Sequence, residues 1–143
     1  MSHVYYRYPI RLSNLMKGAD LPTCDLGASI AQFINMLLHS RYNELRSDPR
    51  FGCAIWDREF DHTVNQFTWE AQLTDSLTGS IREQEPRLHD VSVRVVVQSA
   101  GGIDGLPGSA RRVATVNVAA TVLMTNEPFR FTTRLFLGTL SGR

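Results

Sequence analysis

The sequence changes from a helical pattern to a strand pattern at Glu85-Pro86-Arg87-Leu88. Proline fixes its own φ angle and disfavours helical backbone in the residue before it, so the preceding helix is expected to end near Gln84. In extended backbone, side chains two residues apart point to the same side, which would bring the Glu85 carboxylate and the Arg87 guanidinium together. The triplet is therefore either a plain helix stop with two solvated charges or a rigid polar clamp carrying both signs of charge.

Two helices are expected before this junction. The first follows Asp25, a residue type that caps helix N-termini, and is expected to fray between Ser40 and Leu45. Its apolar residues recur at the spacing of one helical face: Ile30, Phe33, Ile34, Leu37 and Leu38. The second helix is expected over residues 65–84. Its inner side should be formed by Ala71, Leu73, Leu77 and Ile81.

Three strands of alternating polarity are expected after the junction. The first has one apolar face made of Val91, Val93, Val95 and Val97. The second, residues 111–125, has an apolar face of Ala114, Val116, Val118, Ala120, Val122 and Met124, and the third, residues 128–137, has one of Phe129, Phe131, Leu135 and Leu137. The opposite face carries Arg94, Arg130, Arg134, Thr121 and Thr132. One face of the sheet should therefore belong to the core, while the other is polar and positive.

The register of the last hairpin is predicted from its turn. If Asn126-Glu127 is a two-residue turn, Thr125 faces Pro128 and the strands pair outward from there. Apolar residues then lie opposite one another along one face, in the pairs Met124–Phe129, Val122–Phe131, Val118–Leu135 and Val116–Leu137.

These elements predict an α+β fold, with two helices packed on one face of a three-stranded antiparallel meander. Residues 1–25 are expected to form a tyrosine-rich N-terminal arm or edge segment, and residues 26–143 a single domain. Residues 1–23 are expected to be partly disordered in the isolated protein. Between the helices, large apolar side chains should fill the gap: Phe51, Ile55, Trp56 and Phe60. Gly52 among them is expected to allow a tight turn.

The composition favours a soluble protein contacted by other proteins. The chain has 143 residues, is 43% hydrophobic, and has no apolar run long enough to span a membrane or resemble a secretory leader. Its net charge of +1 gives no field for nucleic acid, and Cys24 and Cys53 are too few for a disulfide framework. Fourteen of its fifteen basic residues are arginine, the cation favoured at protein interfaces, although a GC-rich genome would give the same bias.

Catalytic chemistry is not expected, and neither is a metal or a cofactor. The cluster Asp57, Glu59, Asp61 and His62 has no ligand spacing of a known metal loop, and a solvated loop is the preferred interpretation. The alternative is a lysozyme-like peptidoglycan hydrolase that uses Glu59 or Glu85 with Asp57 or Asp61. The glycine-rich segment 101–108 links two strands and is expected to be a hairpin tip rather than a phosphate-binding loop.

Several of these features together resemble the phage W/gene-twenty-five-like family of baseplate wedge proteins, including its type VI secretion branch, TssE. The resemblance rests on the spacing of the first helix, the Phe51-Gly52 connector, and a second helix that ends in Glu85-Pro86-Arg87-Leu88 before valine-rich strands. It covers residues 26–137. The stretch from Ser40 to Arg46 departs from the family pattern, because it lacks the usual glycine.

The resemblance implies a structural role, with the protein binding wedge proteins and starting polymerisation of a contractile sheath by accepting a β-strand. It assigns sheath binding to Glu85, Pro86 and Arg87, and charge reversal at Arg87 is expected to abolish sheath assembly while leaving the fold intact. Supporting contacts are expected from Phe51, Gly52, Arg94, Arg130 and Arg134. The expected partners are sheath subunits and baseplate wedge proteins, with no nucleic acid and no direct membrane insertion. The protein should be a monomer alone, be present in six copies or a multiple in the baseplate, and be cytoplasmic at an inner-membrane-docked baseplate. A phage tail or an extracellular injection particle is the alternative machine.

Overall fold

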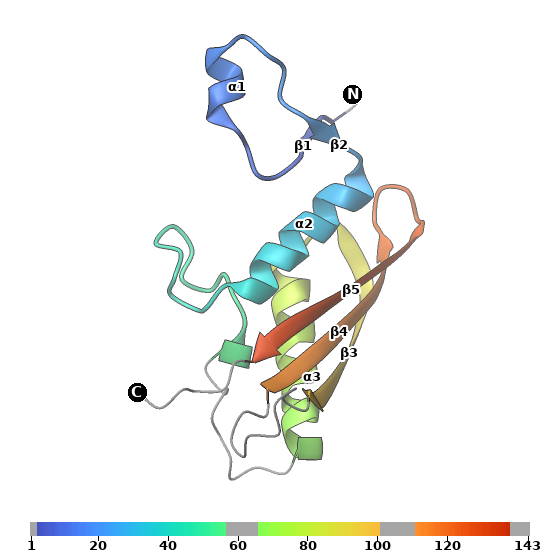
Figure 1. The fold of residues 1–143 in the computed structure, drawn as a ribbon. Helices are drawn as coiled ribbons and strands as arrows, with labels where there is room; N and C mark the ends of the chain where they lie inside the picture. Colours follow the sequence, from blue (N-terminus) through green and yellow to red (C-terminus); the bar gives the residue numbers. More distant parts are fainter. Residues whose placement is uncertain (1–2, 57–65, 101–110, 138–143) are drawn as a thin grey trace.

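The computed structural model describes residues 3–56, 66–100 and 111–137. Within these ranges the chain forms three α-helices, a short 3₁₀ helix and two antiparallel sheets (Figure 1). The elements are β1 (Tyr5–Tyr6), α1 (Leu12–Met16), β2 (Thr23–Cys24), α2 (Leu26–His39), η1 (Ala54–Trp56), α3 (Gln66–Gln84), β3 (Leu88–Ala100), β4 (Arg111–Val122) and β5 (Pro128–Leu137). The expected α+β class is therefore correct, but the chain has an additional helix and an additional sheet.

Helix α2 begins where its cap residue predicts. The Asp25 carboxylate accepts a hydrogen bond from the backbone N–H of Ala28 at 2.7 Å, which satisfies a donor that the first helical turn leaves free. The buried face of α2 consists of Ile30, Ile34, Leu37 and Leu38. The helix ends at His39, so the expected fraying through Ser40 to Leu45 is not seen. Instead, Ser40 is extended and its carbonyl accepts a hydrogen bond from Cys53 N–H.

Helix α3 buries a stripe at four-residue spacing, which consists of Trp69, Leu73, Leu77 and Ile81. The expectation that Ala71 belongs to this inner side is wrong, because Ala71 is exposed. A residue two positions before Leu73 lies about 200° around the helix from it, on the opposite side. Within the described residues, no helix is both long enough and apolar enough to cross a lipid bilayer.

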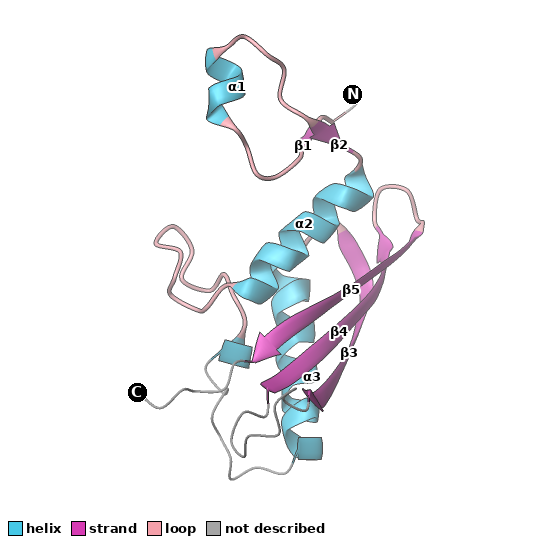
Figure 2. Cartoon of the chain, in the orientation of Figure 1, coloured by secondary structure: helices cyan, strands magenta, loops and turns pink. Residues whose placement is uncertain are grey.

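Strands β3, β4 and β5 form the antiparallel meander in that order. The alternation places the odd-numbered valines of β3 in the core, together with the even-numbered apolar residues of β4. A register shift between His89 and Ser92 interrupts the β3–β4 ladder, and Asp90 there has a φ of 53°. Helix α3 packs along β3, and α2 lies beside β5 (Figure 2). The core fills the space between the two helices and the sheet.

The predicted register of the β4–β5 hairpin is wrong by four residues. Thr121, not Thr125, faces Pro128, and Ala120, not Met124, faces Phe129. Strand β4 ends at Val122, and Met124 is 63% exposed in the connecting loop. Because a shift of four preserves the two-residue alternation, the predicted core residues of β4 up to Val122 and Phe129 and Leu135 of β5 are still buried, with Phe131 partly buried.

A longer loop closed by its own hydrogen bonds, together with one bond to a distant segment, accompanies this register in place of a two-residue turn. Val122 N–H donates to Glu127 O at 2.9 Å, and Asn126 N–H donates to Val122 O at 2.8 Å. Asn126 adopts a φ of 56°, which asparagine tolerates better than most residues. The Leu123 N–H donates to the carbonyl of Arg87 at 2.8 Å, so the end of β4 is held by the Glu85-Pro86-Arg87 segment.

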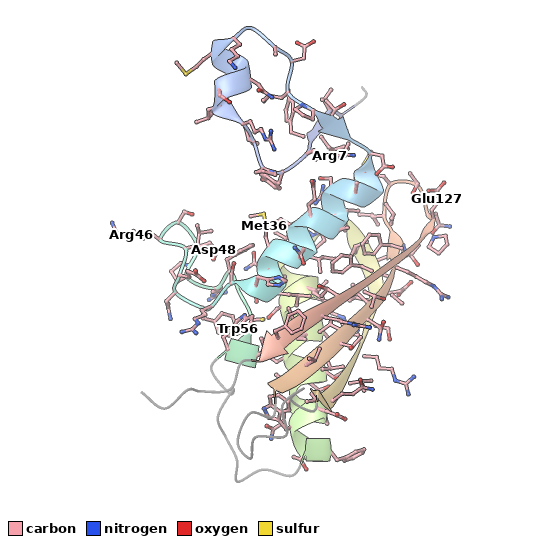
Figure 3. The ribbon with its side chains drawn as sticks, viewed as in Figure 1. Arg7, Met36, Arg46, Asp48, Trp56 and Glu127 are labelled. Carbon is pink, nitrogen blue, oxygen red and sulfur yellow. The ribbon has the colours of Figure 1, made fainter. Side chains whose placement is uncertain are left out.

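The connector between α2 and α3 fills the core where expected. Phe51 and Ile55 are buried, and Trp56 packs against the core with its indole N–H donating to Leu38 O at 2.9 Å. Trp56 lies at η1, close to the end of α2 (Figure 3). Phe60 lies outside the described residues, as does the glycine-rich segment 101–108.

The N-terminal arm is paired rather than irregular. Tyr5 and Tyr6 pair antiparallel with Cys24 and Thr23, and the loop between the two short strands contains α1. The arm projects beyond the N-terminal end of α2 (Figure 1). Gln32 of α2 holds it in place, because its side chain accepts from Tyr8 N–H at 2.9 Å and donates to Tyr6 O at 3.3 Å.

Candidate protein-binding site

Glu85 and Arg87 form a bidentate ion pair at the junction of α3 and β3. The Arg87 Nε and Nη2 atoms each lie 2.8 Å from a different carboxylate oxygen of Glu85. The backbone N–H of Arg87 also donates to Glu85 Oε1, at 3.1 Å. The Glu85 side chain is 1% exposed and that of Arg87 26%. This arrangement supplies several donors to a buried carboxylate, which offsets the free energy that its removal from water costs.

A turn brings the two side chains together, so the expectation of extended backbone is wrong in its mechanism. Glu85 N–H still donates to Ile81 O at 2.8 Å, which completes the last turn of α3. The Glu85 carbonyl then accepts from Leu88 N–H at 3.4 Å, which closes a turn over Pro86 and Arg87. Proline suits the second position of such a turn because its φ is already fixed there.

Arg87 also contacts three other parts of the chain. Its Nη1 donates to Ser29 Oγ in the first turn of α2 at 2.9 Å, and its guanidinium lies 5.8 Å from the ring centre of Tyr5 in β1. Its carbonyl accepts the hydrogen bond from Leu123 already described. The N-terminal arm, α2, the α3–β3 junction and the β4–β5 loop therefore meet at one residue.

The electrostatics of Arg87 favour a permanent charge. The hydrogen bonds that the Arg87 guanidinium donates to Glu85 raise the pKa of Arg87 above its ordinary value, while burial acts in the opposite direction and the negative charge of Glu85 adds to the increase. The guanidinium is therefore ionised at neutral pH. Pro86 is exposed beside it, so Pro86 and the uncovered part of Arg87 form the accessible surface of the triplet.

The two edges of the meander differ in whether their backbone groups are occupied. On β3, the Val97 N–H donates to Glu70 Oε1 at 2.9 Å and the Val91 carbonyl accepts from Arg82 Nη2 at 3.1 Å. Both partners are side chains of α3, which therefore covers this edge. On β5, no hydrogen bond from a described residue reaches the backbone on the side away from β4. The open edge of the sheet is β5.

The outer face of the sheet carries the three arginines expected there. Arg94, Arg130 and Arg134 are exposed, and none of them has an ion-pair partner among the described residues. Among the described strand residues the one acidic side chain is Asp90, which lies in the register shift at the start of β3 and contacts His89 at 2.9 Å. The other described outward positions are not acidic: Ser92, Val96, Gln98, Val113, Thr115, Asn117, Ala119, Thr121, Pro128, Thr132 and Phe136. From Ser92 onward along β3, and along the described parts of β4 and β5, the face is therefore positive without an acidic residue to compensate it.

Phe51 and Gly52 lie away from the Glu85–Arg87 pair. Phe51 is 7% exposed and packs edge-to-face on Phe33, with ring centres 5.6 Å apart. Gly52 has a φ of 133° and lies against the backbone of Arg41. These residues pack at the C-terminal half of α2, whereas Arg87 contacts its first turn, so the structure does not bring the two motifs into one site.

Most of the residues considered for catalysis lie outside the parts of the chain that the structure describes. Asp57, Glu59, Asp61 and His62 lie outside them. Among the residues that the structure describes, no three or more His, Cys, Asp or Glu side chains are grouped as metal ligands. Within the described residues Cys24 and Cys53 form no disulfide, and the buried Cys53 thiol donates to Leu38 O at 3.2 Å.

Several residues of the site could not be identified from the sequence pattern. Tyr5 and Ser29 contact Arg87 from segments 82 and 58 positions away, and no local spacing signals such contacts. Glu70 and Arg82 cover the β3 edge, but on a helix they have the appearance of ordinary solvated charges. Only the length and alternation of the strands indicated that an edge would be left open.

Comparison with known proteins supports a relationship over most of the chain. The sequence family described as baseplate wedge protein gp25 matches residues 24–127. The arm up to Thr23 and the whole of β5 (Pro128–Leu137) lie outside this match. A comparison with curated protein sequences finds no match.

Two solved structures share the fold. One is a candidate tail lysozyme from Geobacter sulfurreducens, with a TM-score of 0.58, 20% identity, and coverage of 82% of this chain and 96% of that one. The other belongs to the baseplate complex of the type VI secretion system, with a TM-score of 0.54, 16% identity, and coverage of 76% and 90%. At these identities the likeness concerns the fold alone.

Proposed function

The chain belongs to the family of baseplate wedge protein gp25, and from this membership we propose that it is a structural subunit of a contractile injection machine of the type VI secretion class. In this proposal it binds wedge proteins and the first sheath subunits, is a monomer alone, and is present in six copies or a multiple when assembled. It acts in the cytoplasm at a membrane-docked baseplate. A phage tail or an extracellular injection particle is the alternative setting for the same role.

The proposed mechanism is addition of a sheath strand to β5. This edge has free backbone groups, while the other edge is occupied by Glu70 and Arg82 of α3. Strand addition uses main-chain hydrogen bonds for affinity and the alternate side chains for specificity. The asymmetry between the two edges is the observation that carries the proposal.

The Glu85-Pro86-Arg87 triplet has two parts in this mechanism. Glu85 is buried and both its oxygens bind Arg87, so its proposed role is to hold the guanidinium in position. Pro86 and the exposed part of Arg87 are proposed to contact a partner. Since Arg87 also fixes Leu123 after β4, the triplet sets the end of the hairpin whose second strand is the open edge.

The competing function is a lysozyme-like hydrolase, which the description of the Geobacter sulfurreducens structure favours. A glycosidase acid needs a raised pKa and access to the sugar. Glu85 is instead 1% exposed, and both its oxygens bind Arg87, so its carboxyl group has no access to a sugar. Purified protein should release no glycan from peptidoglycan; release that is lost in Glu59→Gln would establish the hydrolase instead.

The structural proposal is tested by co-purification with the sheath and wedge subunits encoded beside this chain. The informative variant is Thr132→Pro, because the Thr132 N–H points out of the β5 edge and proline there removes a donor that the folded monomer does not use. Its control is Thr132→Ala, which removes the 2.8 Å hydrogen bond from Thr132 Oγ1 to Asn117 but keeps the N–H.

Both variants should fold, and only Thr132→Pro should lose sheath binding, by at least about tenfold. Wedge binding should persist in both. If Thr132→Pro is folded and still binds the sheath subunit with unchanged affinity, strand addition at β5 is wrong.

A further inference from the structure

The direction of each backbone group on β5 follows from hydrogen bonds at its two neighbours. In an antiparallel ladder, the N–H and C=O of one residue point to the same side, and this side alternates along the strand. Val97 N–H is bound by Glu70, so it points away from β4, and its partner Ala114 must direct its backbone groups toward Leu135 of β5. The bonds of Val122 to Glu127 and of Leu123 to Arg87 confirm the same alternation.

The even-numbered residues of β5 therefore direct their N–H and C=O groups to the open edge. These residues are Arg130, Thr132, Arg134 and Phe136. Their side chains are the ones on the outer, exposed face of the sheet. A strand that adds here would bond to the backbone of the two arginines and place a side chain directly beside each, with Cβ atoms about 4.5–5.5 Å apart.

The charges at this edge specify what those side chains must be. Arg130 and Arg134 lie about 13 Å apart along the strand, with the hydroxyl of Thr132 between them bound to Asn117. Arg94 lies two strands away on the same face, about 10 Å from β5, and adds to the positive field without touching an added strand. Like charges directly opposite one another destabilise a pair of strands, and opposite charges stabilise it.

The core-facing residues of β5 indicate which residue types suit the inward positions of an added strand. Phe129 and Leu135 are 7% and 0% exposed, whereas Phe131 is only partly buried against the core. An added strand would extend the apolar layer beside Phe131, which favours apolar residues at its inward positions.

From these observations we propose that the segment received by β5 carries two carboxylates four residues apart, opposite Arg130 and Arg134, with apolar residues at the alternate inward positions. This inference rests on the proposed function, because it names the chemistry of the strand that the sheath subunit would supply. The two arginines thereby select the register and the identity of the partner, while the backbone supplies affinity.

The test uses two synthetic peptides of about nine residues that alternate threonine and valine. One has glutamate at two outward positions four residues apart, and the other has lysine there. The ¹⁵N-labelled full chain is titrated with each peptide at low salt. We expect the glutamate peptide to bind at least about tenfold more tightly and to protect the amides of even-numbered β5 residues from exchange.

Charge exchange provides the decisive comparison. Arg130→Glu/Arg134→Glu should reverse the preference, so that the lysine peptide binds better. The matched control is Arg41→Glu/Arg46→Glu, which makes the same change in net charge on the loop after α2. Arg46 of this loop lies away from β5 (Figure 3). This control should keep the preference for glutamate. An amide spectrum of each variant shows that the fold is retained.

The inference is overturned if both peptides bind equally, if neither binds, if the exchange variant does not reverse the preference, or if the protected amides lie on β3. Its failure is separable from failure of the proposed function. If sheath binding is unchanged by Arg130→Glu/Arg134→Glu, the inferred carboxylates are wrong but the proposed sheath-binding function is retained. If the glutamate peptide is preferred but no sheath subunit binds, the proposed function is wrong, while the preference of β5 for an acidic strand is retained.

Discussion

At the scale of single residues, Arg87 combines a structural and a surface role. Its bonds to Glu85, Ser29 and the Leu123 N–H hold the junction together, while about a quarter of its side chain remains exposed. Charge reversal at Arg87 would place a second carboxylate against the buried Glu85. The expectation that such a variant keeps its fold is therefore not supported by the geometry, and Arg87→Glu cannot separate binding from folding.

Arg87→Ala is expected to lower the free energy of unfolding by about 3–5 kcal/mol, because it leaves the buried Glu85 carboxylate without its cation. Ser29→Ala is the control, since it removes one hydrogen bond to the same guanidinium and should cost only about 1–2 kcal/mol. Urea unfolding of both variants measures the difference. Equal losses would show that the buried pair contributes little.

The pH dependence of this pair follows from the raised pKa of Arg87. A cation whose pKa is higher in the folded protein stabilises the fold below its unfolded pKa, and this contribution is lost only as the pH rises through the folded value. For arginine both values lie far above neutrality. The contribution of Arg87 to stability should accordingly be constant across the neutral range.

Two glycines are expected to respond to alanine with opposite signs. A Cβ at Gly52 would lie 2.7 Å from the backbone C and O of Arg41, and the φ of 133° is strained for any L side chain. Gly52→Ala should therefore destabilise by at least about 2 kcal/mol. Gly79 is exposed in α3, and a Cβ added there would meet no neighbouring atom within 4 Å. Gly79→Ala should therefore stabilise the protein by about 0.5–1 kcal/mol. Thermal unfolding of both variants measures these changes. Midpoints that move in the same direction would show that the prediction of opposite effects is wrong.

At the scale of secondary-structure elements, the apolar pattern of the sequence predicts which helices and strands form better than it predicts how the strands pair. The spacing of apolar residues predicted α2, α3 and the bounds of β5 closely, because burial on one side imposes a period that the sequence must satisfy. The β4–β5 register could not be obtained in this way. A four-residue slip preserves the same apolar face, and the hydrogen bond from Leu123 to Arg87 that decides between the alternatives crosses from another part of the chain.

At the scale of the whole molecule, the N-terminal arm is an appendage to the domain. None of its residues belongs to the buried core, and α1 has no buried residue. It is held by Gln32 and by the contact between Tyr5 and Arg87. The arm up to Thr23 also lies outside the residues that match the family.

Removal of residues 1–23 should leave a folded protein, with a loss of about 1–2 kcal/mol from the contact with Arg87 and the bonds to Gln32. Tyr5→Leu is the control and should account for about 0.5–1 kcal/mol of this loss. In the free full chain, the arm amides should exchange fastest among the described residues. Loss of cooperative unfolding in the truncated protein, or slow exchange throughout the arm, would show that the arm is an integral part of the fold.

The sequence by itself determined the class of fold, the faces of its helices and strands, the family, and the triplet at the junction. These follow from local backbone preferences and from the periods that a buried face requires. Only the tertiary structure decided that a turn joins Glu85 to Arg87, that α3 covers the β3 edge, and that β5 remains open. Those features depend on hydrogen bonds between residues far apart in the chain, for which periodicity carries no information.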